Sequence, residues 1–182
     1  IEPFCGGCSV LYYILNNCPD MFKAYLCNDL NKPLIYLYNM VKRDPEDVAT
    51  CYGRLWRQLN IDNDLERKKV YFTQVRSVFN ENHDPRLLFF NMRTTTNGMP
   101  RYSRNGDFNN SFHMTRNGMN PERMREIIME WSRLLNKYNV NFVSGSYNRV
   151  TPGAGDLMYL DPPYAHTKGM YYGAIDCDAL IA

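Results

Sequence analysis

Short apolar segments that alternate with amphipathic helices place the strongest limit on what this chain can fold into. The predicted strands cover residues 1–4, 24–27, 140–143 and 157–160. Apolar residues at helical spacing predict helices over residues 10–15, 32–41, 45–59, 64–80, 85–91 and 121–138. Such alternation is typical of an open parallel α/β sheet, in which ligands bind at the carboxyl ends of the strands.

Two of these strand ends carry residues suited to binding a nucleotide. The turn Cys5-Gly6-Gly7-Cys8 follows the first strand, and its glycines let the backbone approach a ligand closely. Ser9 is the expected N-cap of the next helix. Asp29 ends the second strand at a spacing that resembles the nucleotide fingerprint, in which an acid accepts hydrogen bonds from ribose hydroxyls. Both features also have structural interpretations, as a simple turn and as a helix cap.

The segment Asp161-Pro162-Pro163-Tyr164, at the end of the last predicted strand, is more specific. Consecutive prolines fix an extended turn and remove two backbone donors, which leaves carbonyl groups free to accept hydrogen bonds from an amino group. The Asp161 carboxylate adds another acceptor, and the Tyr164 ring offers a face for stacking. These residues predict a site for a planar ring that carries an amino group, in preference to a rigid turn with a surface tyrosine.

An arginine-rich segment interrupts the helical pattern. From Arg93 to Arg116 the chain has four arginines and one acidic residue. Within this segment, Asn105-Gly106 lies between short runs that contain Tyr102 and Phe108, which predicts a β-hairpin. The local charge favours an anionic partner, although the net charge of the whole chain is only +2.

Composition excludes several other classes of protein. With 182 residues, of which 45% are hydrophobic and 22% charged, the chain has the size and composition of one ordinary globular domain. It has no apolar run near the ~20 residues of a membrane helix and no signal-peptide pattern, so an intracellular rather than secreted protein is expected. Cys5 and Cys8 have a spacing found in zinc and redox sites, but no second such pair follows. Reduced cysteines and no metal site are therefore expected.

Together these motifs resemble those of the Dam-type DNA adenine methyltransferases over essentially the whole chain. The similarity is carried by residues 2–10, 28–31 and 161–164. Residues 97–102 and 106–109 resemble the DNA-contacting hairpin of that family. The Asp-Pro-Pro-Tyr motif also occurs in other amino-directed methyltransferases, some of which act on RNA. The hairpin favours duplex DNA, because a hairpin can enter the DNA major groove but not the deep groove of an RNA helix.

The resemblance implies roles for individual residues. It implies a turn that cradles S-adenosylmethionine at Phe4, Gly6 and Gly7, with Asp29 as the ribose-binding acid and Asp161 also in the donor site. The implied catalytic residues are Asp161, Pro162, Pro163 and Tyr164. The implied DNA contacts are Asn97, Met99, Arg101 and Arg116. Cys8 stands where the family often has a further glycine.

The fold that the resemblance implies is α/β: a Rossmann-like class I methyltransferase sheet with a helical and hairpin DNA-recognition insertion. The expected parts are residues 1–49 with the first part of the donor-binding domain, residues 50–119 with the insertion, and residues 120–182 with the remainder of that domain. Both ends are expected to be incomplete, so that a flanking segment or another chain completes the sheet.

The implied activity is site-specific methylation of the adenine amino nitrogen in duplex DNA, with the target base flipped out of the stack. The implied setting is DNA methylation, including restriction-modification, and the recognition sequence stays open. Two alternatives also stay open. One is a catalytically silent remnant that serves as a DNA-binding or structural component, and the other is an RNA adenine methyltransferase.

Overall fold

The computed structural model describes residues 1–96, 98–115 and 117–163. Within these ranges it contains six α-helices and a parallel pair of regular strands, which confirms the expected mixed α/β class. No helix in the described part of the chain combines the length and the apolar character of a membrane span.

The chain divides into two compact units. The first unit contains Ile1–Pro45 and Ile128–Pro162, and the second is built around Glu46–Ile127. Since α6 (Pro121–Lys137) runs through residue 128, it contributes to both units.

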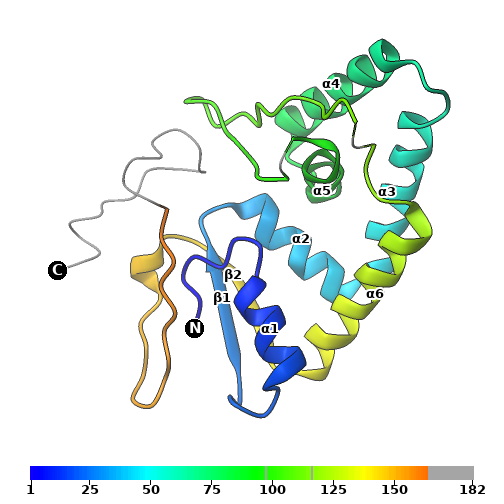
Figure 1. Ribbon diagram of the computed structural model, residues 1–182. Coiled ribbons are helices and arrows are strands. Elements are labelled where there is room, and N and C mark those ends of the chain that lie inside the picture. Colours follow the sequence, from blue (N-terminus) through cyan, green and yellow to red (C-terminus); the bar gives the residue numbers. More distant parts are fainter. Residues whose placement is uncertain (97, 116, 164–182) are drawn as a thin grey trace. The chain divides into compact units, whose positions relative to one another are not determined.

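A parallel sheet forms the centre of the first unit (Figure 1). Strand β1 (Tyr25–Asp29) pairs with β2 (Val140–Ser144), in register from Tyr25 beside Val140 to Asp29 beside Ser144. On the other side of β1, Glu2 forms a parallel bridge with Cys27. The two strands predicted over residues 24–27 and 140–143 are therefore confirmed, within two residues at each end.

The strand predicted over residues 1–4 is shorter than expected, yet it has a neighbour on each side. The Ile1 amino group donates to the Leu157 carbonyl at 2.7 Å, and the Tyr159 N–H donates to the Ile1 carbonyl at 2.9 Å. This is the hydrogen-bond pattern of parallel neighbours. The segment predicted as a strand over residues 157–160 thus runs beside residue 1, although it is not a regular strand.

Helix α2 (Lys32–Arg43) packs on both strands of the sheet and buries Leu34, Ile35 and Leu37. Its first turn is fixed by Asn31, whose side chain accepts a hydrogen bond from the Leu34 N–H, and by Pro33 at the start of the helix.

Helix α1 (Ser9–Asn17) begins differently from the prediction. The N-cap is Cys8, which has a φ of +54° and makes no side-chain capping bond, so the predicted Ser9 cap is wrong. The Cys8 N–H donates to the Cys5 carbonyl at 2.7 Å, which closes a four-residue turn immediately before the helix.

The second unit is a set of helices that carries the hairpin. It contains α3 (Pro45–Leu59), α4 (Leu65–Asn82) and α5 (Pro85–Thr94), which follow the predicted helices within a few residues. Its core is aromatic, and the fully buried rings are Tyr52, Phe72, Phe79, Phe90 and Phe108.

The predicted hairpin is present, with an antiparallel bridge between Tyr102 and Phe108. Its turn contains Gly106, whose φ of +87° explains why an Asn-Gly pair stands there. The hairpin packs on α4 through edge-on contact between the Phe108 and Phe79 rings and through contact between the Phe112 and Phe72 rings.

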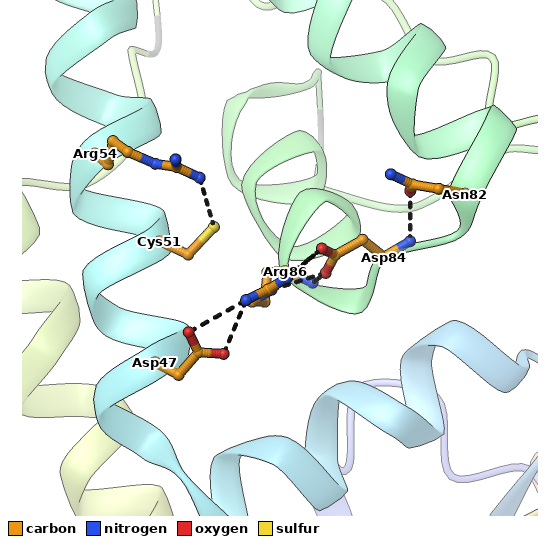
Figure 2. Close-up of polar contacts among 6 residues, drawn as sticks. All are labelled: Asp47, Cys51, Arg54, Asn82, Asp84 and Arg86. Carbon is orange, nitrogen blue, oxygen red and sulfur yellow. Dashed lines mark hydrogen bonds and ion pairs between the residues drawn. The ribbon is translucent and has the colours of Figure 1, made fainter.

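One arginine joins two helices of the second unit (Figure 2). The Arg86 guanidinium donates to both carboxylate oxygens of Asp84, at 2.6 Å for the shortest contact, and to both of Asp47 in α3. Asp84 is also the N-cap of α5, because it accepts the Arg86 N–H. Burial alone would raise the pKa of Asp84, but the hydrogen bonds and charge of Arg86 outweigh it, so the pKa of this carboxyl is lowered.

The variant Asp84→Asn tests this link. Asparagine retains a capping oxygen but removes the charge, so the free energy of unfolding should fall by about 1 kcal/mol at neutral pH. Because the pKa of Asp84 is lowered in the folded state, the difference is fully present above ~pH 4, the pKa of an unfolded aspartate. It is lost as the pH falls through the folded pKa. Urea unfolding at neutral and acidic pH measures both effects.

The matched control is Glu126→Gln, which breaks the exposed ion pair between Glu126 and Arg123 in α6. This pair is open to solvent, so its loss should change stability less. Equal effects of the two variants would show that Arg86 does not link α3 and α5 energetically.

Candidate functional site

The carboxylate of Asp29, at the carboxyl end of β1, holds the glycine turn. Its Oδ2 accepts the Gly6 N–H at 3.0 Å, and its Oδ1 accepts the Asn31 N–H at 2.8 Å. Burial raises the pKa of Asp29, and these backbone hydrogen bonds act against that rise. A carboxylate has about four lone-pair sites, so Asp29 can hold the turn and still accept a hydrogen bond from a ligand hydroxyl.

The carbonyl of Gly6, which belongs to the next peptide group, is held by α2. The Tyr38 hydroxyl donates to the Gly6 carbonyl at 2.9 Å, while the Tyr38 ring stacks on Phe142 of β2 at 4.9 Å between ring centroids. Burial raises the pKa of Tyr38 well above its usual range, so the hydroxyl stays a donor at neutral pH. The turn is thus fixed by one residue from a strand and one from a helix.

The fixed turn leaves room for a ligand. A Cβ built on Gly6 would have no atom within 4 Å, and one on Gly7 would meet only the Ser9 hydroxyl at 3.8 Å. Gly6 also has a φ of +43°, which a side chain would strain. A ligand can therefore approach the backbone here as closely as the sequence pattern predicts.

A buried asparagine ties the neighbouring loops together. The Asn28 side-chain amide donates to the Pro3 carbonyl at 2.9 Å and to the Gly145 carbonyl at 3.0 Å. Pro3 precedes the glycine turn, and Gly145 follows β2. Asn28 of β1 thus joins two loops, one after the first parallel segment and one after β2, at the edge of the sheet where Asp29 lies.

The cysteines of the turn form part of the core. Cys5, Cys8 and Cys27 are buried, and the five cysteines in the described ranges are free. Hydrogen bonds with Cys27 and Cys5, together with burial, raise the pKa of the Cys8 thiol well above its usual range. The thiol is therefore protonated and unreactive at neutral pH. Among the described residues, no three His, Cys, Asp or Glu side chains gather as a metal site.

The remaining predicted residues of the first unit lie at the same edge of the sheet. The half-buried Phe4 ring packs against Tyr147 at 5.2 Å between ring centroids. Asp161 is exposed and Pro162 half-buried, two and three residues beyond the Tyr159 amide that bonds to Ile1. Phe4, Gly6, Gly7 and Asp29 are thus brought together, and Asp161 follows the adjacent parallel segment. Within the described part of the chain, no hydrogen bond or ion pair joins Asp161 to the turn.

The predicted DNA-contacting residues belong to the second unit. Met99 and Arg101 are exposed on the first arm of the hairpin, on either side of Pro100. Asn97, Arg116 and the catalytic candidate Tyr164 lie outside the described residues. Pro163 is half-buried.

Sequence reasoning missed several residues that shape the site. Tyr38 and Asn28 hold the glycine turn and its neighbouring loops, and Asn110 holds the hairpin. The position of Asn28, directly before Asp29 at a predicted strand end, could have marked it as a residue of the site. Tyr38 has no such signal, because its place in the helical pattern marked it only as a core residue.

A parallel sheet edge with a fixed glycine turn and an acid on the next strand is the arrangement of a nucleotide-binding site in an α/β protein. The family of D12 class N6 adenine-specific DNA methyltransferases matches residues 1–177 of this chain. The chain therefore belongs to this family.

Individual relatives agree with this membership. The chain is 35% identical over 171 residues to the DNA adenine methylase of Serratia marcescens, which covers 91% of this chain and 57% of that protein. It is 30% identical over 176 residues to the type II methyltransferase M.MjaIII of Methanocaldococcus jannaschii, which covers 90% of this chain and 57% of the relative. It is 32% identical over 171 residues to the DNA adenine methylase of Vibrio cholerae, with 91% and 56% covered. The chain thus spans somewhat more than half the length of these relatives.

The variant Tyr38→Phe tests how the turn is held. It removes only the hydroxyl that donates to Gly6, so the free energy of unfolding should fall by about 0.5–1.5 kcal/mol. The control is Tyr36→Phe on the same helix, where the side chain is exposed and the hydroxyl makes no hydrogen bond with the described residues. Chemical denaturation of both variants makes the measurement. If Tyr38→Phe were as stable as Tyr36→Phe, the contact with Gly6 would not stabilise the fold.

Proposed function

We propose that this protein is a site-specific DNA adenine methyltransferase, which transfers a methyl group from S-adenosylmethionine to the amino nitrogen of adenine in duplex DNA. The observation that carries the proposal is the Gly6 turn, held open by Asp29 and Tyr38 in a chain of this family. We also propose a Rossmann-like sheet, which the parallel order of residues 157–159, 1–2, β1 and β2 supports.

The donor would lie against Phe4, Gly6 and Gly7, with Asp29 as its ribose acceptor. The open space beside both glycines and the spare lone pairs of Asp29 fit a nucleoside with free hydroxyls. When bound, S-adenosylmethionine supplies a methyl group on a sulfonium, which needs no further activation. The task of the protein is then to position the nucleophile.

The target amino group would be held by the segment that follows Tyr159. The Asp161 carboxylate and the Pro162 carbonyl would accept its two hydrogens, which favours a lone pair on nitrogen that is directed at the methyl group. Pro163 keeps this segment extended, and Tyr164 would stack on the flipped base. The lowering of the activation free energy then comes mainly from the orientation of the amino group relative to the methyl group.

DNA would be recognised through the second unit. Met99 and Arg101 are exposed on an anchored hairpin, and Asn97 and Arg116 belong to the same segment of sequence. An arginine on such a hairpin can pair with a guanine edge in the major groove. The parts of the chain would be donor-binding residues 1–49, the recognition insertion 50–119 and residues 120–182 with the Asp-Pro-Pro-Tyr motif. DNA as substrate favours an intracellular location.

The variant Asp29→Asn tests the donor site in the full-length protein. Loss of a charged hydrogen bond to ribose should weaken donor binding by about 1.5–3 kcal/mol. Since only the ionised carboxylate accepts fully, wild-type affinity should fall as the pH drops through the Asp29 pKa. That pKa is raised, so the fall begins at a higher pH than for an ordinary aspartate. The variant should bind weakly at every pH.

Calorimetric titration of the donor across this pH range makes the measurement. The control is Asp20→Asn, which changes an exposed aspartate of the same unit and should leave donor affinity at the wild-type value. A donor affinity of Asp29→Asn equal to that of the control would remove Asp29 from the site.

The variant Asp161→Ala tests the catalytic assignment. The methylation rate at saturating donor and DNA should fall about a hundredfold or more, because an interaction made in the transition state is lost. Affinity for duplex DNA should stay near the wild-type value. Transfer of a labelled methyl group to duplex DNA and to structured RNA gives the rate and also tests the substrate class. Asp156→Ala, an exposed acid of the preceding loop, is the control and should remain active. Equal rates for the two variants would sink the assignment.

A further inference from the structure

The side chain of a buried asparagine, Asn110, forms hydrogen bonds with the residues on either side of Pro100 in the hairpin. Asn110 is 6% exposed, and its Oδ1 accepts the Arg101 N–H at 2.6 Å. Its Nδ2 donates to the Met99 carbonyl at 2.8 Å. Pro100 lies between these two residues and has no N–H. The Asn110 side chain thus supplies hydrogen bonds that a regular antiparallel ladder would take from the backbone.

Asn110 is itself held by α4. Arg76 donates from Nη1 to the Asn110 carbonyl at 2.7 Å, and its guanidinium lies over the Phe72 ring at 6.0 Å from the ring centroid. Two residues earlier in the hairpin, the Asn80 side chain accepts the Phe108 N–H at 2.9 Å and donates to the Phe108 carbonyl at 3.2 Å. The second arm of the hairpin is therefore fixed to a helix, and the Asn110 side chain carries that constraint across to the first arm.

This constraint acts on the residues that face outward. Alternation along the hairpin buries Tyr102, Phe108 and Asn110 and exposes Arg101 and Asn109. The Arg101 side chain is exposed, while its N–H is bonded to a buried group, so the direction in which the side chain leaves the hairpin depends on Asn110. Met99 is 49% exposed and is held through its carbonyl in the same way.

We propose that Asn110 is a positioning residue for sequence recognition, which sets the direction of Met99 and Arg101 and is itself fixed by Arg76. This inference rests on the proposed function, since it assumes that the hairpin contacts duplex DNA. Asn110 does not touch the DNA. It acts by keeping two outward side chains in one arrangement, so that less conformational freedom is lost on binding.

The test uses Asn110→Leu in the full-length protein, because leucine has a similar size but neither hydrogen bond. Two duplexes serve as probes: one with the sequence that the wild-type protein methylates, and one scrambled duplex of the same composition. The ratio of the two dissociation constants should fall by about tenfold, as for the loss of one base contact. Affinity for S-adenosylmethionine should stay unchanged. Exchange of the Arg101 amide with solvent, measured without DNA, should become at least about tenfold faster.

A double-mutant cycle separates positioning from general destabilisation. Arg101→Ala should lower the same ratio, and Asn110→Leu combined with Arg101→Ala should lower it by less than the sum of the two single effects, because both changes remove the Arg101 contact and only the effect on Met99 remains. Asp84→Asn is the control, since it weakens the same unit at a site distant in sequence from the hairpin and should leave the ratio unchanged. Arg76→Gln removes only the anchor of Asn110 and should lower the ratio by less than Asn110→Leu.

The outcomes are distinct. An unchanged ratio in Asn110→Leu that still binds donor, or a fully additive loss in the double variant, would overturn the proposal. If Asn110→Leu fails to fold, as loss of donor binding would show, then Arg76→Gln decides, and an unchanged ratio there overturns the proposal. A wild-type protein that does not distinguish the two duplexes would overturn the proposed function, and this inference with it, even if the Arg101 amide behaves as expected.

Discussion

The backbone of Gly6, whose N–H is held by Asp29 and whose carbonyl is held by Tyr38, is the point on which the arrangement of the first unit depends. These two bonds fix the turn after the first strand to the neighbouring strand and to the helix that covers the sheet. Asn28 extends the same connection to the loop after β2. Hydrogen bonds within the protein therefore restrict the conformational freedom of this edge of the sheet.

In the second unit, the hairpin has few backbone hydrogen bonds of its own and needs stabilisation from outside. Isolated two-stranded hairpins are marginally stable in water. Here Asn80 and Arg76 bond the hairpin backbone to α4, and the Phe108 and Phe112 rings pack on the same helix. A helix therefore takes the place of a third strand, while Met99 and Arg101 stay exposed on the hairpin.

The sequence predicted the elements whose signal is local. Helical spacing gave the helices, and the Asn105-Gly106 pair gave the hairpin turn, because both depend on residues a few positions apart. The approach of Asp29 to Gly6 also followed, since the carboxyl ends of parallel strands share one edge. The hydrogen bond from Tyr38 to Gly6 joins residues 32 positions apart, and no periodic pattern in the sequence indicates such a contact. The bonds from Asn110 depend on hairpin register, which the sequence does not reveal to a single residue.

Cys8 combines a positive φ with complete burial, and this pairing restricts which substitutions the position can accept. Glycine would relieve the backbone strain, of about 1 kcal/mol or more, but would leave a void where the thiol contacts Cys5 and Cys27. Alanine would keep the strain and part of the void, and a larger side chain would have to displace a neighbouring thiol. Glycine at this position is therefore best accommodated together with a change in the core residues that contact the thiol. The side chain at position 8 thus couples the backbone conformation of the turn to the packing of β1, through Cys27.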